Sequence, residues 1–373
     1  MRIVDVNGLV LALIRKCLFM SSPSITRQPS SPGTVADCDA APRSKMRRLT
    51  GVQLLASGSY VPEEVVTNED LQQLGYDSDW IIQRTGINTR HRTPAHLATS
   101  DLAYEASQRC LDAAGESADD IDMIVMATMT PDHPAPSTAC FLQERLGATQ
   151  AGAMDLNAAC AGFMYALITG AQFIGARTCR RVLVVGADVN TRIVNPNDEK
   201  TFPLFGDGAG AVLLGAGNDD QGLLAFTLGA DGSGTDLLRI PGGGSRHPLT
   251  AQSLDDEEQY IQMEGRPVFK WAVRMLTDTL QGVLAHADCT MDDIKHVVLH
   301  QANLRIIEAA AEALDIPREK MLINVDQYGN TSAGSIPLGL DEVCESGRLS
   351  RGDRVLLCGF GAGLAWGASV IQW

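Results

Sequence analysis

Three residues that could together perform acyl transfer are far apart in this sequence. Cys160 lies in D-L-N-A-A-C-A-G-F, His300 opens H-Q-A-N-L-R, and Asn330 lies in Y-G-N-T-S-A-G-S. A cysteine thiolate attacks thioesters readily. A histidine and an asparagine can direct two hydrogen-bond donors at one carbonyl oxygen, which stabilises an enolate. The set predicts a thiol acyltransferase, provided that the fold brings the three segments together.

The surroundings of each residue favour this chemistry over a purely structural role. Cys160 precedes a predicted apolar helix over 161–174, and a helix N-terminus stabilises a thiolate, so we expect a lowered pKa. The alternative is a small buried cysteine in the core. His300 could be a core histidine and Asn330 a turn residue. Their polar or small-residue surroundings argue against those alternatives.

A repeat in the chain suggests how the three segments could meet. D-D-I-D-M-I-V at 119–125 resembles D-D-I-K-H-V-V at 292–298, and R-V-L-V-V-G at 181–186 resembles R-V-L-L-C-G at 354–359. Both offsets are 173 residues (292 minus 119 and 354 minus 181). Two matches at one spacing predict two similar halves, one holding Cys160 and the other holding His300 and Asn330. A pseudo-two-fold pairing of the halves would bring them to one cleft.

Predicted strands alternate with predicted helices in both halves, which indicates an α/β fold with buried sheets. Among the strands expected over 123–127, 182–186 and 354–358, the one over 182–186 shows no alternation, as expected when both faces are covered. We divide the chain into a leader over residues 1–46, an N-terminal half over 47–222 and a C-terminal half over 223–373. The leader contains a Ser/Pro-rich stretch, and we expect it to be disordered or to reflect a misassigned start.

Composition narrows the possible functions further. The 373 residues carry a net charge of −15, which is unfavourable for general binding to nucleic acid or to anionic membranes. The nine cysteines are scattered, which argues against a disulfide framework and for a reducing, cytoplasmic location. The glycine-rich stretches at 206–211 and 359–363 do not match a dinucleotide or Walker loop.

Several motifs together carry a resemblance to a known family. Residues from about 50 to 373 resemble β-ketoacyl-acyl carrier protein synthase III, of the thiolase-like superfamily. The motifs are D-W-I-I-Q-R-T-G-I (79–87), P-S-T-A-C (136–140), N-A-A-C-A-G-F (157–163), F-G-D-G-A-G-A (205–211), H-Q-A-N-L-R-I (300–306), G-N-T-S-A-G-S-I-P (329–337) and G-F-G-A-G-L-A-W-G (359–367).

The resemblance implies a duplicated, five-layer α/β/α/β/α fold and a homodimer. It implies the condensation that initiates type II fatty-acid synthesis, in which acyl-CoA and malonyl-acyl carrier protein give 3-oxoacyl-acyl carrier protein, CO₂ and CoA. The partners would be acyl carrier protein and acyl-CoA, with no metal and no redox cofactor.

The resemblance also assigns roles to residues. Cys160 resembles the nucleophile, His300 and Asn330 the decarboxylation pair, and the backbone N–H groups of Cys160 and Ala362 the oxyanion hole. Trp80 and Arg84 resemble the residues that hold the adenine end of CoA. The segment that resembles the carrier-docking site consists of Gln301, Ala302, Asn303, Leu304 and Arg305.

The sequence departs from the family pattern in two places. Glu308 and Glu312 follow the docking segment where members often carry lysine, and Ala135 stands where acetyl-using members often carry phenylalanine. We expect Ala135 to widen the acyl pocket. Two alternatives stay open: a related Cys-His-Asn condensing enzyme of secondary metabolism, and a silent dimer partner that binds acyl-CoA. The intact Cys-His-Asn set argues against the silent partner.

Overall fold

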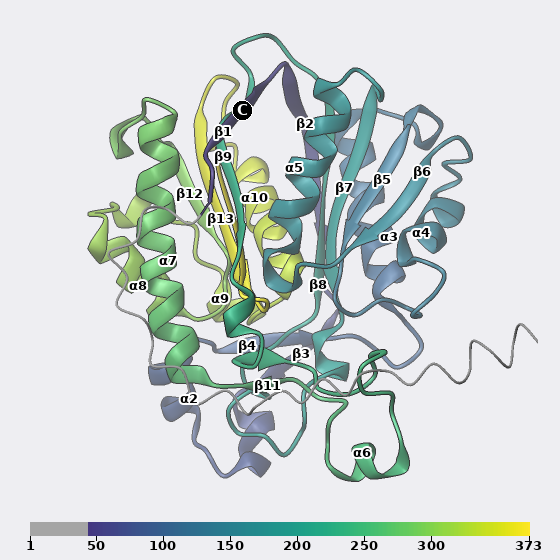
Figure 1. The fold of residues 1–373 in the computed structure, drawn as a ribbon, viewed down its shortest axis with the longest axis vertical. Coiled ribbons are helices and arrows are strands. Elements are labelled where there is room, and N and C mark those ends of the chain that lie inside the picture. Colours follow the sequence, from purple (N-terminus) through teal and green to yellow (C-terminus); the bar gives the residue numbers. More distant parts are fainter. Residues whose placement is uncertain (1–43) are drawn as a thin grey trace, which may run out of the picture. The chain divides into compact units, whose positions relative to one another are not determined.

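A computed structural model describes residues 44–373, and two five-stranded sheets form its framework (Figure 1). The first sheet has the order β2-β8-β7-β5-β6. Its strands β5, β6 and β7 are parallel, and β8 runs antiparallel to both β2 and β7. The bounds are β2 Val52–Tyr60, β5 Met123–Ala127, β6 Gly152–Leu156, β7 Arg181–Asp188 and β8 Gly208–Ala216.

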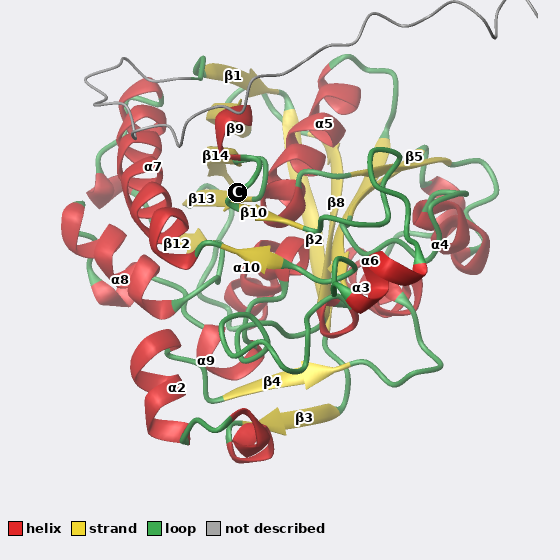
Figure 2. Cartoon of the chain, turned by 60° about the horizontal axis from the view of Figure 1, so that its bottom comes forward, coloured by secondary structure: helices red, strands yellow, loops and turns green. Residues whose placement is uncertain are grey.

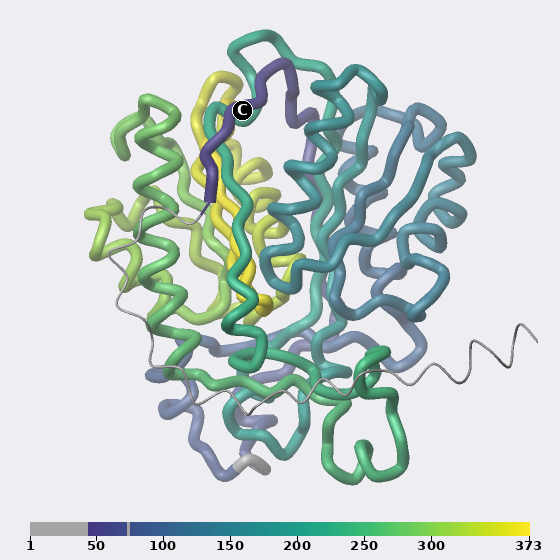
Figure 3. The backbone as a smooth tube through the Cα atoms, viewed as in Figure 1, coloured from purple at the N-terminus to yellow at the C-terminus, as the bar shows by residue number. Residues whose placement is uncertain are grey.

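The second sheet is built mostly from the C-terminal half. Its order is β1-β9-β14-β13-β12, with β12 and β13 parallel and the other neighbours antiparallel. The bounds are β1 Arg47–Thr50, β9 Gly222–Ala230, β12 His296–Leu299, β13 Arg354–Gly361 and β14 Ala365–Gln372. Figure 3 shows β1, the first described strand, running beside β9. The sequence assigns β1 to the N-terminal half, whereas it pairs with the sheet of the C-terminal half.

Helices complete a layered arrangement around these sheets. Helices α5 (Gly162–Gly175) and α10 (Ser335–Glu345) lie between the sheets and contact strands of both (Figure 1). Helices α3 (Thr99–Ala114) and α4 (Thr138–Leu146) cover the outer face of the first sheet, and α7 (Gly265–His286) covers that of the second. Helix α8 (Leu304–Ala313) packs on α7. The five-layer α/β/α/β/α fold expected from the resemblance is confirmed.

The central helix α5 can be buried on all sides because it carries no charged residue. The α5 sequence G-F-M-Y-A-L-I-T-G-A-Q-F-I-G is apolar on nearly every side, as a helix enclosed by two sheets must be. Its Phe163, Met164 and Leu167 are fully buried in one cluster with α10 residues such as Ile336 and Leu340. Burying side chains of this size contributes about 1.5–3 kcal/mol each. This shared core holds the two halves together.

The internal repeat appears in the structure element by element. A shift of 173 residues takes the start of β5 to that of β12, the start of β7 to that of β13, and the start of α5 to that of α10. The short 3₁₀ helix η3 (Ala159–Ala161), which holds Cys160, is likewise matched by η8 (Ser332–Gly334). The sequence repeat is therefore a structural repeat. The half boundaries at residues 46 and 222 remain a prediction.

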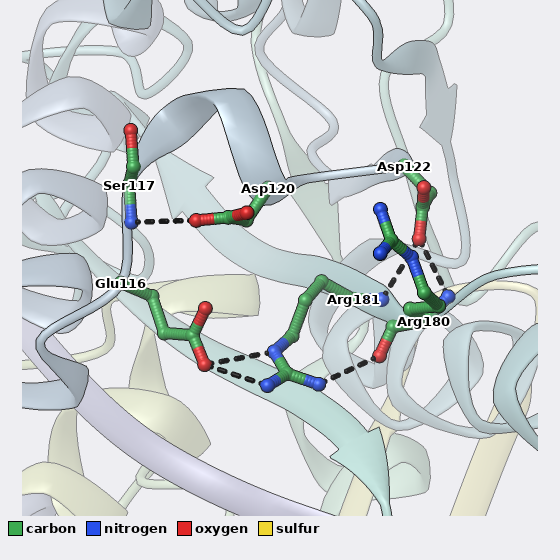
Figure 4. Close-up of polar contacts among 6 residues, drawn as sticks. All are labelled: Glu116, Ser117, Asp120, Asp122, Arg180 and Arg181. Atoms are coloured by element: carbon green, nitrogen blue, oxygen red, sulfur yellow. Dashed lines mark hydrogen bonds and ion pairs between the residues drawn. The ribbon is translucent and has the colours of Figure 1, made fainter.

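Equivalent polar contacts occur at the starts of the repeated strands β7 and β13. In Figure 4, the Arg181 guanidinium donates to Glu116 Oε1 from Nε at 3.0 Å and from Nη2 at 2.7 Å. The repeat partner of Arg181 is Arg354, whose Nη1 lies 3.9 Å from Asp293 Oδ1 and donates to Cys289 Sγ at 3.2 Å. An arginine at the first position of each repeated strand thus ties that strand to the turn before the neighbouring strand.

Asp122 makes a further contact in this region. Its Oδ2 accepts hydrogen bonds from the backbone N–H groups of Arg180 and Arg181 (Figure 4). Partial burial raises the pKa of Asp122, but the bonds from Arg181 and Arg180 outweigh it, so the net pKa is lowered. A lowered pKa in the folded state means that this carboxylate stabilises the fold above its unfolded pKa. The contribution is lost as the pH falls through the folded pKa.

We therefore expect Asp122→Ala to lower the free energy of unfolding at neutral pH by about 1–2 kcal/mol, because two hydrogen bonds to a charged acceptor are removed. Urea denaturation measures this difference. Asp119→Ala is the matched control, since Asp119 is exposed and accepts no hydrogen bond through its side chain among the described residues. An equal loss in both variants, or a loss in Asp122→Ala that persists unchanged in acid, would contradict this assignment.

A smaller group of elements lies at one end of the two sheets. Figure 2 shows the antiparallel pair of strands β3 and β4 beside α2 and α9. The bounds are β3 Glu64–Thr67, β4 Thr89–Arg92, α2 Ser78–Thr85, α6 Ala251–Asp255, α9 Val325–Tyr328, β10 Leu238–Arg239 and β11 Gln262–Met263. The remaining 3₁₀ helices are η1 Glu69–Leu74, η2 Ala118–Asp120, η4 Asn190–Arg192, η5 Gly232–Gly234, η6 Met291–Asp293 and η7 Arg318–Lys320.

The expected leader falls almost entirely outside the described residues. Its last three residues, 44–46, are described and contact the second sheet. Trp366 Nε1 donates to Ser44 Oγ at 3.3 Å, and Thr227 Oγ1 donates to the Lys45 carbonyl oxygen at 3.2 Å. Within residues 44–373, no helix combines the length and the apolar character needed to cross a membrane.

Candidate active site

The three candidate residues come from loops at the carboxyl ends of strands and at the starts of the central helices. Cys160 lies in η3, between β6 and α5. His300 directly follows β12, and Asn330 lies between α9 and η8, just before α10. The 3₁₀ helices η3 and η8 contact each other, and β13 contacts η3. The repeat therefore brings the N-terminal thiol to the C-terminal imidazole and amide, as the sequence predicts.

Cys160 is held in a tight, buried turn. Ala159 has a φ of 47°, and its N–H donates to Asn157 Oδ1 at 3.0 Å, which fixes the residue before the thiol. A side chain at Gly361 would place its Cβ 2.8 Å from the Cys160 nitrogen. Only glycine therefore lets β13 approach the backbone of Cys160 this closely.

The Cys160 thiol faces a hydroxyl. Ser332 Oγ donates to Cys160 Sγ at 3.4 Å. Burial raises the pKa of Cys160 to about 12, and the Ser332 hydrogen bond only partly offsets this. The lowered pKa expected from the helix N-terminus is wrong, because desolvation of the thiolate outweighs the favourable effect of the helix end. Formation of the thiolate in this site requires a group that takes up the proton.

His300 is a neutral imidazole in an apolar environment. Its ring is buried and meets Phe360 edge-on, with ring centroids 5.1 Å apart. Burial lowers the pKa of His300 to about 3, so the ring stays uncharged at neutral pH. Its Nδ1 is buried without a hydrogen-bond partner among the described residues. A buried ring with unused hydrogen-bonding capacity is expected where a substrate supplies the missing partner.

Asn330 is fixed through its backbone and its side-chain oxygen. Its N–H donates to the Leu204 carbonyl at 2.8 Å, and its own carbonyl accepts from the Gly206 N–H at 3.1 Å. Its Oδ1 accepts from the Ser332 N–H at 2.9 Å. With the side-chain oxygen engaged, the NH₂ group of Asn330 is left available as a hydrogen-bond donor. Asn157 makes the same bond to Ala159 in the repeat, so the local geometry is duplicated.

Strand β13 links the parts of the site. Its Phe360 packs on the His300 ring, and the next residue, Gly361, lies against Cys160. The proposed oxyanion-hole residue Ala362 follows directly and is half-buried. Beyond it, Leu364 and Asp231 exchange backbone hydrogen bonds of 2.9 and 2.7 Å, which anchor the turn. The position of Ala362 next to Gly361 is compatible with the expected role of its N–H, which stays a prediction.

The residues of the expected carrier-docking segment differ in how far they are exposed. Gln301 is 1 % exposed, and its amide donates to the carbonyls of Leu299 and Leu322 while its Oε1 faces the N–H groups of Asn324 and Val325. These bonds hold Gln301 inside the protein, where it ties the His300 loop to the segment before α9. Its membership in the carrier-docking segment stays a prediction.

The rest of that segment forms the start of α8. Ala302, Asn303 and Leu304 are half-buried, and Arg305 is exposed. Asn303 caps α8 by accepting from the Arg305 N–H at 2.9 Å, and its Nδ2 donates to the Arg84 carbonyl at 3.1 Å. This bond joins the start of α8 to the end of α2. The residues expected to bind the carrier and those expected to bind CoA are therefore neighbours.

The two expected CoA-binding residues share one face of α2. Arg84 lies one turn after Trp80, with its guanidinium carbon 5.9 Å from the centre of the Trp80 ring. Tyr76 stacks on Trp80, and their ring centroids are 3.9 Å apart. An aromatic stack beside an exposed arginine can hold a purine ring and its phosphates.

Ala135 lies outside this cluster. It is exposed, in the loop before α4, and so does not line a pocket around Cys160 within the single chain. Two residues that sequence reasoning did not single out do lie in the cluster: Ser332, which contacts the thiol, and the buried Asp188 at the end of β7. The signal for Ser332 was its place 173 residues after Ala159, and the signal for Asp188 was a carboxylate directly ending an apolar strand.

Among residues 44–373, no three His, Cys, Asp or Glu side chains lie close enough together to hold a metal ion. The two cavities described for this part of the chain are also away from the three candidate residues. One of about 890 Å³ lies at the starts of β12 and β13 and is lined by charged residues such as Lys295 and Asp353. The other, about 300 Å³, lies beside α8.

Two family models match the chain. One, described as 3-oxoacyl-[acyl-carrier-protein (ACP)] synthase III, matches residues 154–232, and its C-terminal counterpart matches residues 284–373. Cys160 falls in the first and His300 and Asn330 fall in the second. Each of the two models thus covers one of the two chain segments that contribute the candidate residues.

Curated relatives and solved structures agree with these models. The chain is 54% identical over 346 residues to a β-ketoacyl-[acyl-carrier-protein] synthase III of Rhodopirellula baltica, covering 88% of this chain and 100% of the relative. It is 48% identical over 323 residues to a Bacillus cereus protein of the same name, covering 86% and 99%. The crystal structure of 3-oxoacyl-[acyl-carrier-protein] synthase III from Aquifex aeolicus superposes with a TM-score of 0.80 at 38% identity, covering 87% and 100%.

Proposed function

Because this chain belongs to the β-ketoacyl-acyl carrier protein synthase III family, we propose that Cys160, His300 and Asn330 carry out the condensation that initiates fatty-acid synthesis. The reaction joins an acyl group from acyl-CoA to malonyl-acyl carrier protein and releases CO₂ and CoA. The observation that carries the proposal is the 54% identity over 346 residues to a relative of that name, in a chain whose two halves bring a thiol, a neutral imidazole and an amide together.

In the first half-reaction, Cys160 takes the acyl group. Its sulfur attacks the thioester carbonyl carbon of acyl-CoA, and the CoA sulfur leaves with a proton. The developing oxyanion would be held by the N–H groups of Cys160 and Ala362. A covalent intermediate of this kind divides the reaction into two steps and lets CoA leave before the second substrate enters.

In the second half-reaction, His300 and Asn330 bind the thioester oxygen of the malonyl group. As the bond to the carboxylate breaks, CO₂ leaves and negative charge moves onto that oxygen. A neutral imidazole N–H and an amide N–H stabilise the enolate without adding a charge to a buried site. The enolate carbon then attacks the carbonyl carbon of acyl-Cys160. The Cys160 thiolate leaves and takes up a proton from solvent, which replaces the one that left with CoA. The apolar contact of His300 with Phe360 supports this role, because it keeps the ring neutral. No metal or redox cofactor takes part in this scheme.

We assign acyl-CoA to the surface around Trp80 and Arg84, and the carrier protein to the neighbouring start of α8. Arg305 is the exposed cation on that helix, and its guanidinium lies 5.7 Å from the ring centre of Phe269. Farther along, the exposed Glu308 and Glu312 are unfavourable for an acidic partner. The carrier would therefore contact the first turn of α8 rather than its whole length.

A homodimer is the assembly that fits the first sheet best. Its last strand, β6, has one edge that no other strand of residues 44–373 pairs, and an open edge is a template for pairing with a second copy. Helix α4, which contacts β6, carries the exposed Phe141 and follows the exposed loop that holds Ala135. In such a dimer the Ala135 loop of one copy would reach the other copy, which gives Ala135 a route to influence the acyl pocket.

Steady-state kinetics of the purified chain tests the function. With malonyl-acyl carrier protein and a panel of acyl-CoA thioesters, we expect formation of 3-oxoacyl-acyl carrier protein that depends on both substrates. Plots at several fixed carrier concentrations should give the parallel lines of a ping-pong reaction. Intersecting lines, or turnover without an acyl-CoA requirement, would contradict a free acyl-Cys160 intermediate. A chain that binds acyl-CoA without turnover would match the silent partner instead.

A further inference from the structure

A buried carboxylate that the reaction scheme does not use lies next to the nucleophile. Asp188 ends β7 and is fully buried. Its Oδ1 accepts from the Met129 N–H at 2.8 Å and from the Thr128 and Thr130 hydroxyls at 2.9 Å each. Its Oδ2 accepts from the Ala333 N–H at 3.0 Å. None of the ion pairs formed within residues 44–373 includes Asp188.

Ser332 connects this carboxylate to the thiol. Its hydroxyl donates to Cys160 Sγ at 3.4 Å. The next residue, Ala333, donates its N–H to Asp188 Oδ2 at 3.0 Å, which places the Ser332 side chain beside the carboxylate. Burial raises the pKa of Asp188, and the neighbouring Ser332 side chain partly offsets this rise. A serine hydroxyl has one proton to donate, so it cannot donate to both neighbours at once. When Cys160 is a thiol, its S–H can donate to Ser332, and Ser332 to Asp188. When Cys160 is a thiolate, Ser332 donates to the sulfur.

The total charge of the site determines the protonation state of Asp188 when Cys160 becomes a thiolate. A thiolate beside an ionised Asp188 would place two negative charges in a buried region that holds no paired cation, which is strongly unfavourable. Burial raises the pKa of Asp188, and the ionised Asp188 in turn raises the pKa of Cys160. The site therefore favours one negative charge in total, on the sulfur or on the carboxylate. His300, the other titratable group of the site, adds no charge because it stays neutral.

We propose that Ser332 relays the Cys160 proton to the Asp188 carboxylate when the thiol attacks the acyl thioester. The S–H bond of Cys160 breaks as its proton passes to Ser332 Oγ, while the Ser332 hydroxyl proton passes to Asp188. The sulfur then forms a bond to the carbonyl carbon, and the bond from that carbon to the CoA sulfur breaks. The proton returns by the same path to the departing CoA sulfur, so Asp188 ends ionised and Cys160 acylated.

The repeat indicates that the Ser332 hydroxyl is not needed for the fold. Ser332 has a φ of 53°, and its repeat partner Ala159 adopts a φ of 47° as an alanine. The two residues also make the same backbone bond, each N–H donating to an asparagine side chain two residues before it. Ser332→Ala therefore keeps a conformation that alanine already adopts in this fold. In this relay Ser332 contacts the reacting sulfur, and Asp188 acts through Ser332 as a positioning residue.

The relay rests on the proposed role of Cys160 as the acylated residue, so its test uses a reagent that needs neither acyl-CoA nor the carrier. Full-length protein is treated with iodoacetamide at several pH values, and mass spectrometry follows the peptide containing Cys160. We expect Ser332→Ala to slow this alkylation at neutral pH by about 10- to 100-fold, because a hydrogen bond to the charged thiolate is lost. Its rate should recover at higher pH. Ser369→Ala, which removes a buried hydroxyl from β14, should alkylate like the parent.

Asp188→Asn separates the relay from a simple electrostatic effect. If Asp188 only repels the thiolate, removing its charge must speed alkylation of Cys160. If it accepts the proton, the amide cannot replace it and alkylation must slow, with no further loss in the Ser332→Ala, Asp188→Asn double variant. Melting curves of each variant identify a misfolded protein, and Ser332→Ala remains decisive if Asp188→Asn does not fold. Parent-like alkylation of Ser332→Ala, or faster alkylation of Asp188→Asn, overturns the proposal, whatever the outcome of the condensation assay.

Discussion

Replacing Cys160 with serine will remove acyl transfer from labelled acyl-CoA, with a loss of roughly 10³-fold or more, because the serine hydroxyl is a far weaker nucleophile than a thiolate in this site. No radiolabel should remain bound to the protein after denaturation. Decarboxylation of malonyl-acyl carrier protein should continue slowly, because His300 and Asn330 are intact.

Cys140→Ser provides the matched control. Cys140 is an exposed cysteine at the start of α4, so its loss removes a thiol without touching the buried cluster. This variant should carry as much label as the parent. Label on Cys160→Ser equal to that on the parent would show that another residue accepts the acyl group, and the assignment of Cys160 would fail.

The decarboxylation pair should show the opposite defect. His300→Ala and Asn330→Ala should each become labelled by acyl-CoA and yet release CO₂ about 10²–10³-fold more slowly, because each removes one donor from the enolate oxygen. Label trapping and CO₂ release measure the two steps separately. His286→Ala, at the exposed end of α7, should match the parent in both assays.

One outcome would reassign the roles. If His300→Ala were unlabelled while decarboxylation persisted, His300 would be the base that activates the thiol, and the relay through Ser332 would be redundant. The pKa of about 3 argues against that result, because a weakly basic imidazole is a poor acceptor for a proton from a thiol whose pKa is near 12.

Most of the central fold could be predicted because its sequence signals are strong. The strand expected over 123–127 is β5 without adjustment, and the helix expected over 161–174 is α5 shifted by one residue. Both are apolar runs, of 5 and 14 residues, for which burial on all sides leaves little choice. The repeat spacing then placed Cys160 and Asn330 correctly in duplicated turns before central helices.

Other features depend on contacts between distant segments and left no local signal. Strand β9 was not predicted, and nothing in residues 47–50 indicates that they pair with it rather than continue β2. The buried position of Gln301 was missed because its partners come from three other segments. The raised pKa of Cys160 was missed for the same reason: the helix end is visible in the sequence, whereas the depth of burial is a property of the assembled layers.

The placement of β1 has a consequence for how the chain folds during synthesis. Arg47 pairs with Phe226, which is 179 residues later in the chain (226 minus 47). At about 5–20 residues per second, a ribosome needs roughly ten to forty seconds to make the partner of a strand that it has already released. Throughout that time β1, the first strand of the described residues, lacks its partner, while the sheet from β2 to β8 can already form. The described part of the nascent chain therefore cannot finish one half and then the other: its first strand joins the sheet that is made last.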